Sequence, residues 1–252
     1  MVNILIPMAG KNLFFPDGEY PFPKPLIEIG NQTIIERVIA NLAQVDLDAH
    51  FIFIVNGSDC RKFHLDSALG ILTDHRCKIV RLDSETKGAA CSALMAIGHI
   101  ANDTPLMIAN ADQIFEDSVA ELVGAMGDAD AGVVTFDSVH PRWSYVRLDD
   151  LGNVIETAEK RPISRSAIAG LYYFRRGMDF VQAAMQMIEK DAHVNESFFI
   201  APALNEMILK GKTVRTARVR SERYHTFYTP QKIKEYEAAL LRHPLPKSGE
   251  IP

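Results

Sequence analysis

Two short stretches near the start of the chain combine residues that suit an anionic phosphate ligand. Pro7-Met-Ala-Gly10 follows a short apolar run, and after a loop Lys24 stands between two prolines. Glycine lets backbone N–H groups approach an anion without a Cβ in the way. The prolines fix φ on both sides of Lys24 and give it a stiff stem. We expect nucleotide phosphates to bind Met8, Ala9, Gly10 and Lys24; an ordinary loop with a surface lysine is the alternative.

A single aspartate closes the fourth predicted strand. The apolar run Pro105 to Ala109 is followed directly by Asn110-Ala-Asp112. A carboxylate just after a buried strand is well placed to hold a divalent cation, and Mg²⁺ prefers one or two carboxylates together with phosphate oxygens. We therefore expect Asp112 to bind Mg²⁺ and Asn110 to contact the nucleotide. A turn or helix-capping aspartate is the alternative.

Small residues open the helix that is predicted to follow the third strand. Thr86-Lys-Gly-Ala-Ala90 would let a base or a phosphate reach the helix N–H groups. Close packing of a helix on a sheet also favours glycine and alanine, and the pattern does not separate these readings. We expect Thr86, Gly88 and Ala89 to bind the nucleotide, together with Asn56 at the end of the second strand.

A second cation lies in the later half of the chain. Glu159-Lys160 follows the end of a predicted strand, and Lys160 is placed to hold a second phosphate. A solvated turn is the plainer interpretation of these charges. The eight histidines show no spacing typical of metal ligands.

The first half of the chain alternates strands with helices, which predicts an α/β fold with a doubly wound, mixed but mostly parallel sheet. Ligands of such sheets bind at the carboxyl ends of the strands. These ends carry Pro7 to Gly10, Asn56, Asp83 to Thr86 and Asn110 to Asp112. The expected strands are Val2 to Ile6, Phe51 to Val55, Lys78 to Leu82, Pro105 to Ala109 and Ala131 to Phe136; the expected helices are Thr33 to Ala43, Ser58 to Leu72, Lys87 to Ile100 and Val119 to Met126.

The second half changes character and is expected to form a smaller lobe on the same domain. A hairpin turn at Asp149 to Asn153 joins two short strands. We expect one domain over residues 1–243 and a loose tail over 244–252. The further elements predicted are strands at Ser144 to Leu148, Val154 to Ala158, Ala167 to Phe174 and Thr213 to Val219, and helices at Met178 to Lys190, Phe198 to Leu209 and Pro230 to Leu241.

The composition excludes some classes of partner. The 252 residues carry a net charge of −5, from 27 basic and 32 acidic side chains. Without a basic excess the chain is not expected to bind nucleic acid, and no apolar run approaches a membrane span. The opening strand pattern argues against a signal peptide. The three cysteines include no CxxC pair and are typical of reduced thiols, so we expect a cytoplasmic protein.

Taken in order, these residues resemble the sugar-phosphate nucleotidyltransferase family, which has a Rossmann-like fold of glycosyltransferase-A type. The resemblance covers about residues 2 to 240. It implies that a nucleoside triphosphate and a phosphorylated small molecule are condensed with release of pyrophosphate, with Mg²⁺ as cofactor. Lys24 would then contact the triphosphate, Asp112 the metal, and Lys160 with Glu159 the acceptor. The motifs that carry the resemblance are Ala9-Gly10, Pro23-Lys-Pro-Leu26, Gly88-Ala-Ala90, Asn110-Ala-Asp112, Glu159-Lys160, Ala169 to Phe174 and Tyr228-Thr-Pro230.

The chain departs from the family pattern at several positions, which makes it an atypical member. The glycine loop of the family ends in an arginine that helps to neutralise the leaving pyrophosphate, and here that position is Phe14. We expect Lys11 to take over part of this role, although its ammonium is a point charge and lacks the paired N–H donors of a guanidinium. The position of a second metal carboxylate is Thr226. The glycine that the family often has in the acceptor pocket falls at Tyr145 or Val146, and we expect Tyr145 and Gly170 to contact the acceptor.

Three interpretations of function stay open from the sequence. The favoured one is a nucleotidyltransferase that uses CTP with a sugar 1-phosphate or an unusual phosphorylated acceptor. A glycosyltransferase that uses a nucleotide sugar would have a pair of aspartates where Asn110-Ala-Asp112 supplies one. A non-catalytic nucleotide-binding or regulatory homologue would account for Asn12, Phe14 and Thr226. A homo-oligomer is compatible with the sequence.

Overall fold

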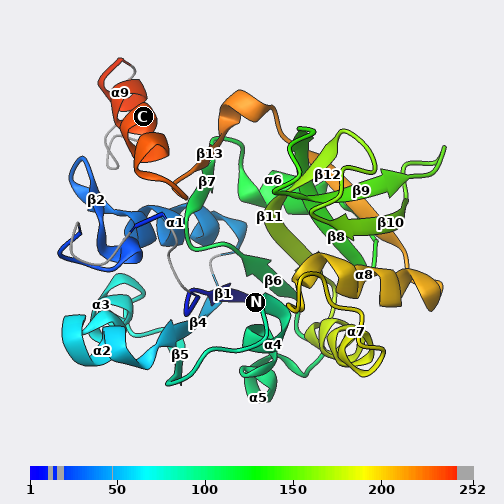
Figure 1. The fold of residues 1–252 in the computed structure, drawn as a ribbon, viewed down its shortest axis with the longest axis horizontal. Coiled ribbons are helices and arrows are strands. Elements are labelled where there is room, and N and C mark those ends of the chain that lie inside the picture. Colours follow the sequence, from blue (N-terminus) through cyan, green and yellow to red (C-terminus); the bar gives the residue numbers. More distant parts are fainter. Residues whose placement is uncertain (11–13, 16–19, 47, 243–252) are drawn as a thin grey trace.

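The structure is a computed structural model that describes residues 1–10, 14–15, 20–46 and 48–242. Within these residues nine strands form one mixed sheet (Figure 1). The strand order is β10-β9-β11-β6-β1-β4-β5, with β8 paired to both β11 and β12. The sheet confirms the predicted fold class. Its strands are β1 (Val2–Pro7), β4 (Ala49–Asn56), β5 (Cys77–Leu82), β6 (Leu106–Ala109), β8 (Ala131–Asp137), β9 (Ser144–Leu148), β10 (Val154–Glu159), β11 (Ser166–Phe174) and β12 (Val214–Arg218).

The centre of the sheet is parallel and buried on both faces. β1 runs parallel to β4 and β6, and β4 runs parallel to β5. Along β1, Ile4 and Ile6 pack into one apolar cluster while Leu5 packs into the other. This alternation follows from the two-residue period of a strand. Parallel strands with both faces covered are typical of doubly wound folds.

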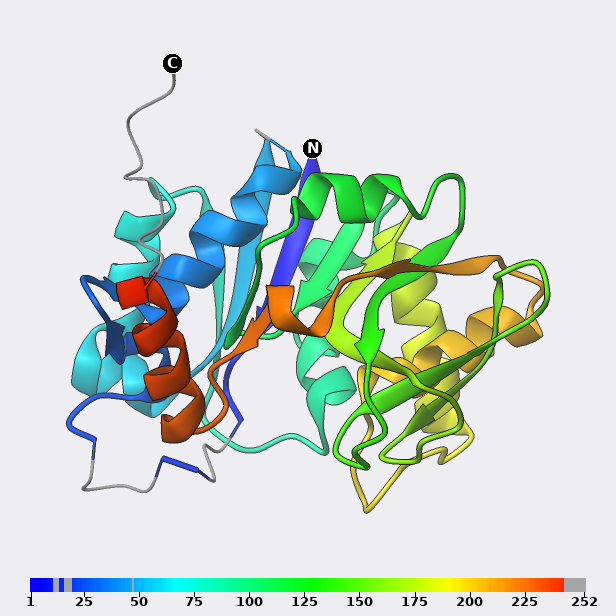
Figure 2. The same ribbon diagram turned by 90° about the horizontal axis from the view of Figure 1, so that it is seen from above.

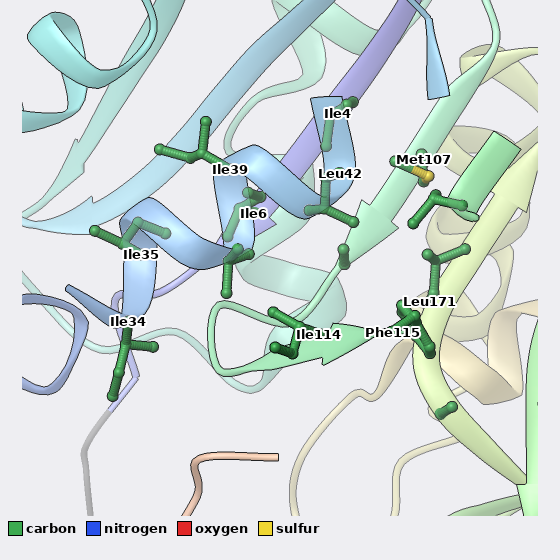
Figure 3. Packing of buried hydrophobic residues seen from close by; sticks show 14 of the residues in the cluster. Ile4, Ile6, Ile34, Ile35, Ile39, Leu42, Met107, Ile114, Phe115 and Leu171 are labelled. Carbon is green, nitrogen blue, oxygen red and sulfur yellow. The ribbon is translucent and has the colours of Figure 1, made fainter. Parts of the chain in front are cut away.

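Helices cover the two faces in separate groups. Figure 3 shows the cluster on the first face, where Ile34, Ile35, Ile39 and Leu42 of α1 (Ile34–Leu42) meet Ile4 and Ile6 of β1. The second cluster contains buried residues of α4 (Ala89–Leu94), α7 (Gly177–Glu189) and α8 (Ile200–Leu209). α1 begins with a capping box in which Thr33 and Glu36 satisfy each other's backbone N–H.

Two predicted helices are each divided in the structure. The segment from Ser58 to Leu72 forms α2 (Gly57–Phe63) and α3 (Leu65–Leu72), separated by His64 in the left-handed conformation. The buried residues Cys60 and Leu65 are five positions apart, which one continuous helix would place on different faces. The inserted residue lets both point inward.

The segment predicted as a helix from Lys87 to Ile100 forms α4 and α5 (Ile97–Ile100). Between them the N–H groups of Met95 and Ala96 bond to carbonyls three residues earlier. This tighter geometry ends the first helix.

The later strands extend the same sheet. β11 runs antiparallel to β6, β8 and β9, and the β9–β10 hairpin forms one edge. The hairpin and the last helix, α9 (Pro230–Arg242), lie toward opposite ends of the long axis (Figures 1 and 2). α6 (Val119–Gly124) precedes β8.

Short strands that the sequence did not predict tie distant segments together. β7 (Gln113–Phe115) pairs with β13 (Tyr224–Thr226), and β2 (Glu28–Ile29) pairs with β3 (Gln32–Thr33). Short 3₁₀ turns complete the fold at η1 (Lys24–Leu26), η2 (Ala43–Val45) and η3 (Ser221–Arg223). None of the described helices has the length and apolar character needed to cross a bilayer. The predicted tail, 244–252, lies outside the described residues.

Candidate active site

The lysine and the aspartate singled out in the sequence lie in direct contact. The ammonium of Lys24 donates a short hydrogen bond to Oδ2 of Asp112, although the two residues are 88 positions apart. Only 13% of the Lys24 side chain and 22% of the Asp112 side chain are exposed. Partial burial strengthens an ion pair relative to one in open water. The phosphate-binding and metal-binding candidates thus share one place.

The backbone fixes both partners. Pro23 precedes η1, whose turn is closed by the bond from the Ile27 N–H to the Lys24 carbonyl. Asp112 lies between β6 and β7, and its carbonyl accepts the N–H of Phe227 at 2.7 Å. The pairing of β7 with β13 holds this turn from the C-terminal part of the chain.

A small pocket opens beside Asp112, with a volume of about 150 Å³. We call it the aspartate pocket. Thr226, at the expected second carboxylate position, lines it together with Phe14 from the glycine loop. Burial and the charge of Asp112 raise the pKa of Tyr224 well above its ordinary value, so the Tyr224 hydroxyl in the pocket lining stays neutral. The complete lining is Phe14, Asn110, Asp112, Gln113, Arg142, Trp143, Tyr224, Thr226 and Tyr228.

A polar cluster forms the floor between this pocket and the next. Asn110 donates to Oε1 of Gln113 at 3.3 Å, and the Tyr224 hydroxyl donates to the same oxygen at 2.9 Å. Gly170 allows this approach: its φ is +62°, and a Cβ there would lie 2.2 Å from Nδ2 of Asn110. Gln113 is 1% exposed, and among the described residues its Nε2 has no hydrogen-bond partner. The glycine is therefore required by the packing of Asn110 and Gln113.

A second pocket, of about 210 Å³, lies against the β9–β10 hairpin. We call it the hairpin pocket. Ser144 and Glu159 face each other in the hairpin register, and the serine hydroxyl donates a short hydrogen bond to the carboxylate. Burial raises the pKa of Glu159 above its ordinary value, although the serine and the charge of Lys160 act in the opposite direction. The complete lining is Ala89, Asn110, Arg142, Trp143, Ser144, Glu159, Ile168, Gly170, Tyr172, Phe199 and Ile200.

Of the residues predicted to bind the acceptor, some line the hairpin pocket and others do not. Glu159 and Gly170 line the pocket, whereas Tyr145 is fully buried in the core with its hydroxyl bonded to the His140 carbonyl at 2.7 Å. The structure corrects the position of Tyr145, because neighbouring residues of a strand point to opposite faces. Ser144 occupies the pocket instead. Lys160 is exposed, has a φ of +53°, and holds its ammonium 4.6 Å from the ring centre of Phe199.

Several residues predicted to bind the nucleotide also have local structural roles. Asn56 caps α2 by accepting the N–H of Ser58 at 2.9 Å. Thr86 bonds to the Ser92 hydroxyl at 2.6 Å. A Cβ on Gly88 would lie 2.5 Å from the Phe198 carbonyl oxygen, so close packing explains that glycine. Their contact with a nucleotide stays a prediction.

The glycine loop is described only in part. Met8 donates its N–H to the Ile54 carbonyl at 2.8 Å, and Ala9 packs partly buried against the second apolar cluster. A Cβ at Gly10 would meet no described atom within 4 Å. Lys11 lies outside the described residues, so its predicted role stays a prediction.

The sequence interpretation missed the residues that start β9. Arg142, Trp143 and Ser144 line the site, yet they precede a strand of the later half. Strand β11 pairs with both β6 and β9, which brings the start of β9 beside the end of β6. A general rule about carboxyl ends of parallel strands does not point to such residues. The cluster of arginine, tryptophan and serine was the available signal.

The residues at Asp112 fit Mg²⁺ in one particular way. Among the described residues there is no group of three or more histidine, cysteine, aspartate or glutamate side chains that could hold a metal. Mg²⁺ is commonly bound by one or two carboxylates with substrate phosphates and water. The partly exposed carboxylate of Asp112, in a pocket that Thr226 also lines, satisfies that requirement, provided that the nucleotide supplies the other oxygens.

Comparison with known families identifies the kind of protein to which this site belongs. A family model described as the MobA-like NTP transferase domain matches residues 17–177, more than half of the chain. The chain belongs to this family. Membership confirms the predicted resemblance to nucleotidyltransferases.

The chain is also similar to individual proteins of known sequence or structure. The chain is 24% identical over 178 residues to the bifunctional protein GlmU of Methanococcus aeolicus, covering 69% of this chain and 40% of that protein. The fold is similar to the nucleoside-diphosphate-sugar pyrophosphorylase from Vibrio cholerae RC9, with a TM-score of 0.82, 24% identity and coverage of 93% and 99% of the two chains. It also resembles a UDP-glucose pyrophosphorylase complexed with UDP-glucose, with a TM-score of 0.74, 14% identity and coverage of 95% and 98%.

Proposed function

We propose that this MobA-like protein condenses a nucleoside triphosphate with a phosphorylated small molecule, in the presence of Mg²⁺, and releases pyrophosphate. The observation that carries the proposal is the direct contact of Lys24 with Asp112, whose carboxylate lines the aspartate pocket. A cation and a carboxylate at this place match the needs of a triphosphate and its metal. CTP is the nucleotide favoured by the sequence, and a sugar 1-phosphate is the first acceptor to test.

The nucleotide would bind between the glycine loop and the aspartate pocket. Lys24 would turn from Asp112 to the β- and γ-phosphates, leaving the Asp112 carboxylate to hold Mg²⁺. The bound metal would neutralise negative charge on the triphosphate. Asn110, which lines both pockets, would contact the part of the nucleotide next to the reacting phosphorus.

The acceptor would bind in the hairpin pocket. Glu159 and Ser144 present an oxygen pair that suits the hydroxyl groups of a sugar or a similar polyol. Lys160, beside Glu159 in the chain, would hold the acceptor phosphate. The aromatic rings of Tyr172 and Phe199 contribute to the apolar part of the wall.

Catalysis then consists of positioning and charge neutralisation. An oxygen of the acceptor phosphate attacks the α-phosphorus, and the bond from that phosphorus to the oxygen bridging to the β-phosphorus breaks. The electron pair leaves with pyrophosphate. Because the acceptor phosphate is already ionised, the step needs no general base.

The test is a pyrophosphate-release assay. Wild-type protein with Mg²⁺ is given ATP, CTP, GTP, UTP or dTTP, each with a panel of sugar 1-phosphates and non-sugar phosphates. Asp112→Asn should lower the rate by at least about 100-fold, the effect expected for losing a major charge-stabilising group. Asp128→Asn is the matched control because Asp128 is fully exposed and paired with Arg175 away from the site.

Each alternative predicts a different result. A glycosyltransferase would consume a nucleotide sugar and release no pyrophosphate from any triphosphate. A non-catalytic homologue would bind a triphosphate without turnover, a reading favoured by Phe14 and Thr226 in the aspartate pocket. Equal rates for Asp112→Asn and Asp128→Asn would remove Asp112 from the reaction.

A further inference from the structure

Arg142 occupies the junction of the two pockets. It lines the aspartate pocket together with Asp112 and the hairpin pocket together with Glu159. Among the described lining residues of both pockets it is the only cationic side chain. No carboxylate among the described residues forms an ion pair with it. As far as the described residues are concerned, the guanidinium is therefore available to bind an anion from a ligand.

Aromatic rings hold Arg142 in place. Its guanidinium carbon lies 3.8 Å from the ring centre of Tyr228 and 5.6 Å from that of Trp143. Stacking of this kind leaves the edge of the fork, with its N–H donors, available for a planar or tetrahedral anion. Phe14 contacts the same Tyr228 ring edge-on at 6.2 Å. The site thus places an arginine near the loop position where the family arginine is replaced by phenylalanine.

The hairpin brings Arg142 close to the second expected cation. The N–H of Lys160 bonds to the Trp143 carbonyl at 3.0 Å, one position beyond the Ser144–Glu159 pair. The backbone of the hairpin therefore couples the segment that bears Arg142 to the one that bears Lys160. Lys160 stacks over Phe199 on the wall of the hairpin pocket, while Arg142 stacks over Tyr228 on the aspartate-pocket side.

We infer that Arg142 binds the phosphate of the acceptor and holds it at the junction of the pockets, facing the α-phosphorus of the nucleotide. The inference rests on the proposed function for the identity of the anion. A dianionic phosphate monoester fits because the fork can donate two N–H bonds while Lys160 supplies a second charge. The acceptor class is then a phosphate monoester whose remaining part fits the hairpin pocket.

The chain contains a reporter next to this residue. Trp143 is the only tryptophan of the protein, so its fluorescence reports on this site alone. The probes are α-D-glucose 1-phosphate and inorganic phosphate, titrated at constant ionic strength against a potassium chloride control. Wild-type protein should change its tryptophan fluorescence saturably with both probes and not with chloride.

Arg142→Gln should weaken binding of both probes roughly 10- to 100-fold, the range for losing a charge-assisted pair of hydrogen bonds. Arg142→Lys should recover only part of the loss, because an ammonium lacks the fork. Arg161→Gln is the matched control, since Arg161 is exposed on the same hairpin and paired with Glu156. It should bind like the wild type, and the melting temperatures of all variants should agree within a few degrees.

The inference would be overturned by wild-type protein that binds neither probe, or by Arg142→Gln that binds both probes as well as Arg161→Gln does. A loss of affinity for the nucleoside triphosphate equal to the loss for the probes would also overturn it, because Arg142 would then serve the nucleotide. Failure of the proposed function is seen separately, as the absence of pyrophosphate release from every triphosphate while phosphate binding at Arg142 persists.

Discussion

Replacing Gly170 by alanine tests the polar floor of the site. The new Cβ would lie 2.2 Å from Nδ2 of Asn110 and 2.5 Å from Oε1 of Gln113, and the backbone φ is +62°. The left-handed conformation costs an alanine about 1 kcal/mol relative to glycine. Losing the Asn110–Gln113 hydrogen bond costs about 1 kcal/mol more, and moving the two side chains adds about 1 kcal/mol.

The total is about 3 kcal/mol, which corresponds to a fall of roughly 6–12 °C in melting temperature for a chain of this length. Gly127→Ala is the matched control because its φ is +59° and a Cβ there would meet nothing within 4 Å. We expect the control to lose about 1 kcal/mol, or roughly 2–4 °C. Calorimetry measures both.

Displacement of Asn110 should also reduce turnover in Gly170→Ala far more than in the control. Melting temperatures within about 1 °C of each other for the two variants, a difference of well under 1 kcal/mol, would refute the reasoning. The polar cluster would then be loosely held, and Gly170 would not be needed to form it.

Three further predictions follow from single residues. Glu159→Gln should be stabilising at neutral pH. Burial raises the pKa of the folded carboxyl, so the stability of the wild type falls as the pH rises above the ordinary pKa near 4.5. The difference in melting temperature between variant and wild type should therefore grow over that range, and a difference that does not change with pH would contradict this. Lys24→Ala should weaken triphosphate binding more than monophosphate binding in calorimetry, because the monophosphate lacks the β and γ groups, and equal losses would make Lys24 a scaffold residue. Lys11→Ala should lower the rate of pyrophosphate release by roughly 10- to 1000-fold if the lysine replaces the loop arginine, whereas an unchanged rate would leave that role to other cations.

The sequence predicted the parallel centre of the fold because its signals are local. An apolar strand such as Val2 to Ile6, and the helical spacing of the apolar residues in α1, can be recognised within a few residues of sequence. The end of a predicted strand then locates Asn110 and Asp112 at the carboxyl edge of the sheet. The division at His64 was missed because a single left-handed residue leaves the surrounding composition helical. The only local sign of the division was that the apolar residues Cys60 and Leu65 are five positions apart.

The remaining parts of the site depend on contacts between distant segments. The pairing of β7 with β13 joins residues more than 100 positions apart, and three-residue strands are too short for a pattern. Arg142 belongs to the site only because β11 bridges β6 and β9. Tyr145 was predicted to line the pocket, but its neighbour Ser144 does so instead. A shift of one residue along a strand moves the side chain to the opposite face of the sheet.

The fate of the labelled phosphates of a nucleoside triphosphate tests the central claim most directly. Wild-type protein, Mg²⁺ and a phosphorylated acceptor are incubated with triphosphate labelled at either the α or the γ position. The proposed function predicts that the α label joins the acceptor in a new nucleoside-diphosphate-linked product, while the γ label appears in pyrophosphate. Release of the γ label as inorganic phosphate, or recovery of both labels in unchanged triphosphate with every acceptor, would contradict it.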